Sequence, residues 1–205
     1  MGKAPQALQN ARTRMWQEEV QMLLSLLDCV VLDKEAVYAS SEFTTGRRLY
    51  ELCRQYNMTT KEELKKRLGK EYERQLLLPN REEGIRFARR LREFGHVVVL
   101  TPNPFQADPL RLEGQNWSQD EYLEFWKMII QTKCQAVYFN EGWEFSDGCT
   151  FEYCVGSDMG LSLFDHLGNP LPREKAADLI WKAVQILEAD GFTVAKLREN
   201  WGRLA

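Results

Sequence analysis

The amino-acid sequence predicts an α/β fold with a mainly parallel central sheet, and three observations support this prediction. An amphipathic helix over 80–94 is followed by Gly95 and a β-branched apolar run over 96–101, the succession that a right-handed βαβ crossover needs. A second apolar run, 136–139, leads through a loop with two glycines into a helix that begins near Asp147. Both strands are short, apolar and without alternation, as in sheets covered by helices on both faces. Together these features predict a Rossmann/flavodoxin-like three-layer fold.

Composition excludes several classes of protein. The 205 residues suffice for one α/β domain, and 44% hydrophobic and 28% charged residues are ordinary for a globular protein. The net charge of -3 comes without clustered Lys and Arg, so nucleic acid is not an expected partner. No apolar run approaches the roughly 18–20 residues of a membrane span, and no signal-peptide layout opens the chain. We therefore expect a cytoplasmic protein with no membrane partner.

Cysteine and histidine usage argues against a metal site. The five cysteines form no Cys-x-x-Cys pair, which favours buried apolar side chains over a disulfide framework or a zinc cluster. The two histidines, His96 and His166, are far apart in the sequence, which disfavours a His-based metal site or a Ser-His-Asp triad. No metal and no cofactor is expected.

The chain is expected to form an N-terminal helical extension over 1–34 and a single α/β domain over 35–205. In the extension, residues up to about 12 are expected to be disordered, apolar residues recur at helical spacing over 16–28, and 29–33 resembles a short strand. The domain carries a charged helical insertion over about 57–78, mostly one solvated helix. The other expected elements are a strand over 35–39, a helix through Cys53, the helix and strand over 80–101, a pocket-wall loop over 103–117, a helix over 118–131, the strand over 136–139, a helix over 147–159, a strand over 161–164, a helix over 173–190, and an edge strand or docked tail over 192–197.

Polar and aromatic side chains gather where three predicted strands end. The carboxyl ends of parallel strands meet at one edge of a sheet, where ligands bind. Residues with aromatic rings (Tyr38, Phe43, Trp143), hydroxyls (Ser40, Ser41, Ser146), amides (Asn103, Asn140) and carboxylates (Glu141, Glu144, Asp147, Glu152) all follow such strands. Aromatic walls suit a flat base, and hydroxyls suit a ribose or a phosphate. The sequence thus predicts a pocket at this edge.

Three stretches, in this order, resemble the nucleoside 2-deoxyribosyltransferase superfamily. They are Val37-Tyr38-Ala39-Ser40-Ser41 with Phe43-Thr44, the helix from Asn80 to Gly95-His96 with its following strand and proline, and Gly142-Trp143-Glu144-x-Ser146-x-Gly148 with Glu152. They look most like a deoxyribosyltransferase-like branch with a GWExSxGxxxE signature, and deoxynucleoside 5'-monophosphate N-hydrolases are other relatives. The resemblance covers about 35–56 and 79–165.

The resemblance implies covalent glycosyl chemistry. Glu152 matches a glutamate that attacks the anomeric carbon, after which water or a second base resolves the intermediate. A carboxylate can trap an oxocarbenium-like centre and divide one hard step into two easier ones. Tyr38 matches the tyrosine that orients this carboxylate, and Asp147 lies near the family's second acidic group, although five positions from Glu152 where six is usual. The expected substrate-binding residues are Ser40, Ser41, Phe43, Asn103, Asn140, Trp143, Ser146 and Gly148. A nucleoside or nucleotide and a second subunit of a homo-oligomer are the implied partners.

Two departures from the family pattern keep other functions open. The helix before the central strand reads Glu124-Phe125-Trp126-Lys127, without the aspartate that handles the leaving base. Ser40-Ser41-Glu42 replaces the glycine-rich phosphate loop of the monophosphate hydrolases, and Glu42 would disfavour a nearby 5'-phosphate. One alternative is a nucleotide-binding or sensing module without catalysis. Another is a partner-binding protein whose working surface is the charged helix over 59–78.

The candidate residues also have purely structural interpretations. Glu152 could be a first-turn carboxylate that interacts with the helix dipole, and Asp147 an N-cap. Trp143 could serve packing alone, and Ser40 and Ser41 could cap a helix.

Overall fold

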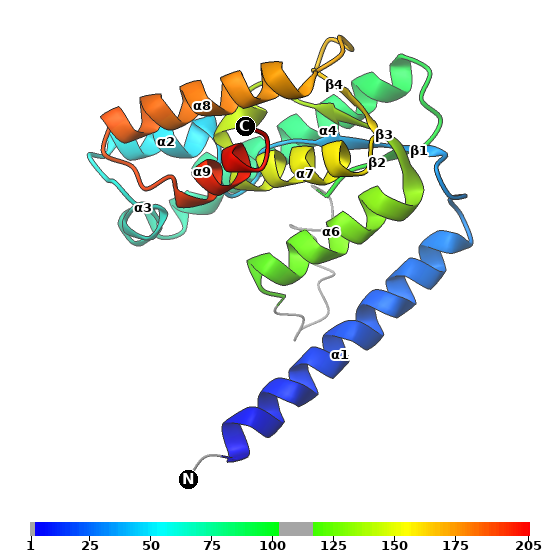
Figure 1. Ribbon diagram of the computed structural model, residues 1–205. Coiled ribbons are helices and arrows are strands. Elements are labelled where there is room, and N and C mark those ends of the chain that lie inside the picture. Colours follow the sequence, from blue (N-terminus) through cyan, green and yellow to red (C-terminus); the bar gives the residue numbers. More distant parts are fainter. Residues whose placement is uncertain (1–2, 103–116) are drawn as a thin grey trace.

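The computed structural model describes residues 3–102 and 117–205, and it confirms the α/β fold (Figure 1). Its central sheet contains the strands β1 (Ala36–Ser40), β2 (Val99–Leu100), β3 (Cys134–Phe139) and β4 (Ser162–Phe164). The strand order is β2-β1-β3-β4, and every pairing is parallel. The chain therefore leaves β1 in one direction for β2 and later returns to the other side of β1 as β3. Ligands in open α/β sheets bind at such a switch point, beyond the carboxyl ends of the two strands.

Helices cover both faces of the sheet, in a three-layer arrangement of the Rossmann/flavodoxin-like kind. On one face, Val37 and Ala39 pack against α4 (Leu78–Glu93), which contributes Phe87 and Leu91. The opposite face packs against α6 (Gln119–Lys133) and α7 (Asp147–Asp158), and Figure 1 shows these two helices in front of the strands with α4 behind them. All five residues of β1 are buried, as expected of a strand with helices on both sides. Successive strand residues point to opposite faces, so Tyr38 and Ser40 share the α6/α7 face.

Four further helices extend the α6/α7 side. They are α2 (Arg47–Gln55), α3 (Lys61–Leu68), α8 (Arg173–Ala189) and α9 (Ala195–Gly202). Ile180 and Leu187 of α8 and Leu197 of α9 are fully buried in the same core cluster as Tyr38 and Phe139. No helix in the described part of the chain is both long enough and apolar enough to cross a membrane.

The N-terminal helix is longer than predicted. Helix α1 spans Lys3–Asp28, so the expectation of disorder up to about residue 12 is wrong from Lys3 onward. Alanine, leucine and glutamine dominate this segment, and their helix propensity is high despite the segment's polarity. Figure 1 shows α1 extending from the body, and it touches α6 through an ion pair of Arg12 with Glu121 at 3.0 Å.

The chain leaves α1 through turns rather than through the predicted strand over 29–33. The bonds Cys29 N→Leu26 O and Val30 N→Leu27 O, at 3.2 and 3.1 Å, close turns and leave no ladder for a sheet. An ion-pair cluster holds the junction instead, because the buried ammonium of Lys133 lies 2.5 Å from Asp28 and 2.6 Å from Asp33.

The charged insertion is two helical pieces, not the single solvated helix predicted over 59–78. Helix α3 begins with a Thr60–Glu63 capping box and ends at Gly69, whose φ of 53° is a left-handed conformation that glycine tolerates. A π-helical turn, η1 (Glu73–Leu77), then continues directly into α4, which starts at Leu78 with Pro79 in its first turn. Leu64, Tyr72 and Leu76 of this region are buried, so the insertion is anchored in the core.

The remaining corrections concern strand and tail lengths. Strand β2 is only Val99–Leu100 rather than 96–101, and Val97 is 92% exposed. Of the two alternatives for 192–197, the docked tail is confirmed and the edge strand is wrong: the segment leads into α9, because Ala195 to Asn200 are mostly good helix formers, and Leu197 is fully buried. The loop expected over 103–117 lies, except for Trp117, outside the described residues.

Helix α7 packs closely on the sheet at Gly156, and this contact yields a stability prediction. A Cβ at this position would lie 2.7 Å from Leu163 Cδ2 and 3.4 Å from Val137 Cγ2. We expect Gly156→Ala to be less stable than Gly202→Ala by about 1 kcal/mol or more in urea denaturation, because displacement of Leu163 and Val137 offsets the helix propensity that alanine adds. Gly202→Ala is the matched control, since nothing lies within 4 Å of its added Cβ. Equal stability of the two variants would contradict the packing at Gly156.

Candidate functional site

The carboxylate of Glu152 is buried at the carboxyl end of the sheet and held by two hydroxyls from β1. Tyr38 Oη donates to Glu152 Oε1 and Ser40 Oγ donates to Glu152 Oε2, each at 2.6 Å. Tyr38 and Ser40 are two positions apart on one strand, so their side chains reach the same face together. Glu152 is 6% exposed, in the second turn of α7 where that helix crosses this face. Glu152 and Tyr38, predicted as nucleophile and orienter, are therefore in direct contact, and Ser40, predicted to bind substrate, donates to Glu152 instead.

Burial controls the protonation of this cluster. Removal from water raises the pKa of Glu152 to about 7, against the opposing effect of the hydrogen bonds from Ser40 and Tyr38. Burial also raises the pKa of Tyr38 well above its usual value, so its phenol stays a donor at neutral pH. Such a carboxyl group changes between acid and nucleophilic carboxylate near neutral pH.

The loop between β3 and α7 consists of a turn, a short 3-10 helix and an N-cap, and it positions the helix that carries Glu152. Gly142 has a φ of 85°, which lets the chain turn sharply after β3. The short 3-10 helix η2 (Trp143–Phe145) follows, and Ser146 then caps α7 by accepting a hydrogen bond from Cys149 N at 3.4 Å. The N-cap is thus Ser146, and Asp147, for which a capping role was one interpretation, is the first helical residue.

A small cavity of about 40 Å³, called here the glutamate cavity, borders Glu152. Four of the predicted substrate-binding residues line it: Ser41, Phe43, Ser146 and Gly148. Tyr122, Trp126 and Cys149 also line it, although the sequence analysis did not select them. Tyr122 and Trp126 are one helical turn apart on α6, a spacing that the sequence displays but that equally fits a core-facing stripe. A cavity of this size holds about one water molecule and would have to open further to admit a sugar ring.

Other predicted residues lie elsewhere. Trp143 is 3% exposed and packs between Phe139 and Tyr153, at ring-centroid distances of 4.9 and 5.2 Å, so its role is packing. Asn140 accepts a hydrogen bond from Arg90 Nη2 at 3.3 Å and does not line the glutamate cavity. The predicted residue Asn103 is outside the described residues.

A second cavity, of about 200 Å³, lies at the switch point between β1 and β3 and is called here the switch cavity. It shares Ser41 with the glutamate cavity. Two arginines and four carboxylates line it: Arg47, Arg48, Glu42, Glu51, Glu83 and Glu141. The surplus of carboxylates disfavours an anionic ligand here.

Glu42 occupies the N-terminus of α2, where an anion could otherwise bind. Its Oε1 accepts a hydrogen bond from Arg47 N at 2.7 Å, and burial raises its pKa to about 8. Gly46 makes room for this arrangement, because a Cβ there would lie 2.2 Å from the Glu42 carboxyl carbon. The first-turn donors of a helix attract phosphate, and a side chain of the protein already uses one of them.

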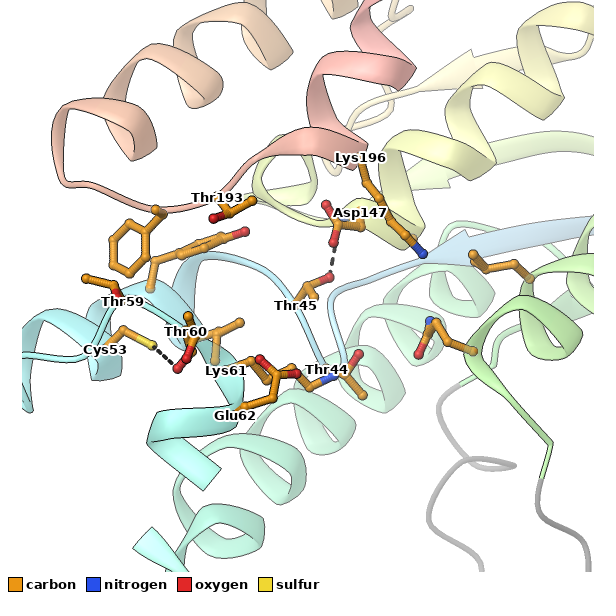
Figure 2. A pocket seen from close by; sticks show the side chains of 16 residues that line it. Thr44, Thr45, Cys53, Thr59, Thr60, Lys61, Glu62, Asp147, Thr193 and Lys196 are labelled. Atoms are coloured by element: carbon orange, nitrogen blue, oxygen red, sulfur yellow. Dashed lines mark hydrogen bonds between the residues drawn. The ribbon is translucent and has the colours of Figure 1, made fainter. Parts of the chain in front are cut away.

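Asp147 faces a third cavity rather than the glutamate cavity. Five positions on an α-helix correspond to a rotation of about 140°, so Asp147 and Glu152 point in different directions from α7. The third cavity, called here the lysine cavity, measures about 310 Å³ and is lined by Asp147, Lys61, Lys196 and several threonines (Figure 2). It shares Thr44, Thr45, Gly148 and two α6 residues with the glutamate cavity, so the two are neighbours.

Sequence reasoning missed the lysine cavity almost entirely. Lys61 and Lys196 come from the insertion and from α9, and a single lysine at a helix start carries no sequence signal for a ligand. Glu141 and Glu144, expected in the pocket, pair with Arg47 at 3.4 and 3.9 Å, and of the two only Glu141 lines a described cavity, the switch cavity. In residues 3–102 and 117–205, no three His, Cys, Asp or Glu side chains gather in a way that could bind a metal ion.

Comparison with known proteins gives one match. A family model described as a domain of unknown function, DUF4406, matches residues 78–165, which is less than half of the chain. Neither a curated protein nor a solved structure shows significant similarity. The matched part is similar to that family from α4 to the end of β4, and it contains Glu152 but not Tyr38 or Ser40.

Proposed function

We propose that this protein cleaves or transfers the N-glycosidic bond of a nucleoside or deoxynucleoside, with Glu152 as the nucleophile. The observation that supports this most is the buried carboxylate with one hydroxyl donor on each oxygen, at the carboxyl ends of the two central strands. This edge of the sheet is where such folds bind small molecules. The arrangement also matches the residues that resemble nucleoside 2-deoxyribosyltransferases.

In the proposed reaction, one Glu152 oxygen forms a bond to the anomeric carbon while the bond from that carbon to the base nitrogen breaks. The base leaves with the electron pair and takes up a proton. Water then attacks the glycosyl ester to regenerate the carboxylate and release the sugar, or a second base attacks to give a new nucleoside. Tyr38 and Ser40 orient the carboxylate, and their hydrogen bonds favour the ionised form that attacks.

A nucleoside suits the site better than a 5'-monophosphate. Glu42 fills the N-terminus of α2, and the switch cavity carries more carboxylates than arginines. Both features disfavour a phosphate at the end of β1.

A homo-oligomer belongs to the proposal as well: Met15, Met22 and Leu26 form an apolar stripe on α1, each more than half exposed, that a second copy could cover.

A binding or sensing module is the second candidate function. The glutamate cavity is small, and the helix α6 supplies Tyr122 and Trp126 rather than an acid for the leaving base. A partner-binding role for the charged insertion receives less support, because Leu64, Tyr72 and Leu76 anchor that region in the core.

Incubation with a panel of nucleosides, deoxynucleosides and their monophosphates tests the proposal, with free base measured by chromatography. We expect release of base from at least one nucleoside by the wild type and none by Glu152→Ala. If the wild type releases no base while both proteins bind the same ligand, the proposal of an enzyme is wrong and that of a binding or sensing module stands.

A further inference from the structure

We propose that the lysine cavity binds a planar heterocycle such as a nucleobase, with Asp147 accepting from an N–H donor on one edge and Lys61 donating to an acceptor on another edge. Where the proposed function holds, this heterocycle is the leaving base. The cavity is about 310 Å³, at the lower end of the roughly 300–1,000 Å³ range of small-molecule sites. Binding itself does not depend on the glycosidic reaction.

The charged groups of the cavity are of both signs and are not paired with one another. Asp147 comes from α7, Lys61 from α3 and Lys196 from α9, and Figure 2 shows Lys61 entering from the side opposite Asp147 and Lys196. Within the described residues, neither Asp147 nor Lys61 has an ion-pair partner, and Lys196 pairs with exposed Asp120 at 3.6 Å. Burial raises the pKa of Asp147 and lowers that of Lys61, so both groups are partly removed from water.

This charge pattern favours a neutral ligand that carries both a hydrogen-bond donor and an acceptor, on different edges. The lining holds two lysines and two carboxylates, Asp147 and Glu62, and therefore has no net charge. A simple anion would be repelled by Asp147, and a simple cation by the lysines. A base that presents an N–H on one edge and a carbonyl or ring nitrogen on another satisfies both half-buried groups without bringing a charge into the cavity.

The other walls also suit a base. Tyr50 and Phe192 line the cavity and pack edge to face, with ring centroids 5.0 Å apart. Hydroxyls of Thr44, Thr45 and Thr193 offer further donors and acceptors. Aromatic walls with a few convergent polar groups are the usual composition of small-molecule sites.

Gly148 connects this cavity to Glu152. It lines both the lysine cavity and the glutamate cavity, and a Cβ there would have no atom closer than 3.9 Å. A sugar at Glu152 could therefore carry its base past Gly148 toward Asp147. Lys61 and Lys196 lie outside the stretches that resemble deoxyribosyltransferases and outside the matched 78–165, so the proposal gives the insertion and α9 a function of their own.

The direct test is calorimetric titration of the full chain with cytosine, uracil, adenine and hypoxanthine, and with deoxyribose and inorganic phosphate as comparison ligands. We expect at least one base to bind, and we expect Lys61→Met and Asp147→Asn each to weaken that binding about tenfold or more, because Lys61→Met removes one hydrogen bond to a charged group and Asp147→Asn removes the charge of the acceptor. Lys66→Met, on the exposed side of α3, is the matched control and should bind as the wild type does.

Several results would overturn the proposal: binding of no base, binding of phosphate alone, or base affinity unchanged in both Lys61→Met and Asp147→Asn. The outcome separates from that of the proposed function. Base binding that depends on Lys61, without base release from any nucleoside, supports this site and refutes the glycosidic reaction. Base release with a KM that Lys61→Met does not change supports the glycosidic reaction and refutes base binding in the lysine cavity.

A second variant tests the connection between the cavities. Gly148→Leu should raise the KM for the nucleoside about tenfold or more, since the added side chain fills the space that both cavities share at Gly148. Gly202→Ala serves as the control for a helix glycine that lines no cavity. An unchanged KM in Gly148→Leu would remove Gly148 from the path.

Discussion

Glu152→Gln is expected to lose base release by a factor on the order of 10³ or more while the folded protein becomes more stable above pH 7. Glutamine has the shape of the native side chain and can still hydrogen-bond to the hydroxyls of Tyr38 and Ser40. It cannot form a glycosyl ester, so the loss of activity follows from the missing nucleophile. The gain in stability follows from the missing buried charge.

The sign of the stability effect follows from proton linkage. The folded-state pKa of Glu152 is about 7, above its ordinary value of 4.5, so the folded protein binds the proton more tightly than the unfolded chain does. The contribution of Glu152 to the free energy of unfolding is therefore fully present below pH 4.5 and is lost as the pH rises through about 7. A shift of this size corresponds to roughly 3 kcal/mol of lost stability at pH 8.

Urea denaturation of wild type and Glu152→Gln at pH 5 and pH 8 measures this effect. We expect the variant to exceed the wild type by roughly 3 kcal/mol at pH 8 and by much less at pH 5. Glu199→Gln, an exposed glutamate on α9, should show no such difference between the two pH values. A Glu152→Gln protein that is less stable than the wild type at pH 8 would show that the carboxylate serves the fold, and the structural interpretation of Glu152 would prevail. A wild type that is less stable than Glu152→Gln at pH 8 would fit an active site, where function often lowers stability.

The sequence predicted the centre of the fold and of the site more accurately than their surroundings. Strands β1 and β3 are apolar runs, and the period of two in β1 already places Tyr38 and Ser40 on one face. Tyr38 and Ser40 then contact Glu152 because α7 crosses the same face of the sheet. These are local signals, and the structure brings both hydroxyls to 2.6 Å from the carboxylate, although Ser40 was predicted to bind substrate.

The surroundings depend on geometry that sequence patterns do not carry. The resemblance to deoxyribosyltransferases groups Asp147 with Glu152, but the helix rotates the two side chains apart and gives them different cavities. Lys61, the first residue of α3, lines the lysine cavity, whereas the charge pattern over 59–78 favours one exposed helix. Residues 192–197 showed too short a periodic pattern to distinguish a strand from the start of α9, and tertiary contacts of Leu197 decide it.

Tyr38→Phe is expected to reduce kcat/KM for base release about 10- to 100-fold and to shift its pH dependence upward. The phenol donates the 2.6 Å hydrogen bond to Glu152 Oε1, and a hydrogen bond to a charged group contributes about 1.5–3 kcal/mol. Only the ionised carboxylate attacks, so kcat/KM should rise with pH through about 7 in the wild type. Because the hydrogen bond favours the ionised form, its removal raises the pKa and moves the rising limb to higher pH.

Tyr153→Phe is the matched control, since Tyr153 lies in the same core but donates to Leu171 O at 2.9 Å instead of to Glu152. It should lose some stability and keep the wild-type pH profile. A purely structural Tyr38 would give the same result as Tyr153, a loss of stability with an unchanged rising limb, and the orienting role of Tyr38 would then be wrong. Ser40→Ala adds an independent check, because its hydroxyl binds the other carboxylate oxygen at 2.6 Å and its loss should shift the limb in the same direction. Parallel shifts in both variants would identify Glu152 as the titrating nucleophile, since Tyr38 and Ser40 share no other acceptor among the side-chain hydrogen bonds of the described residues.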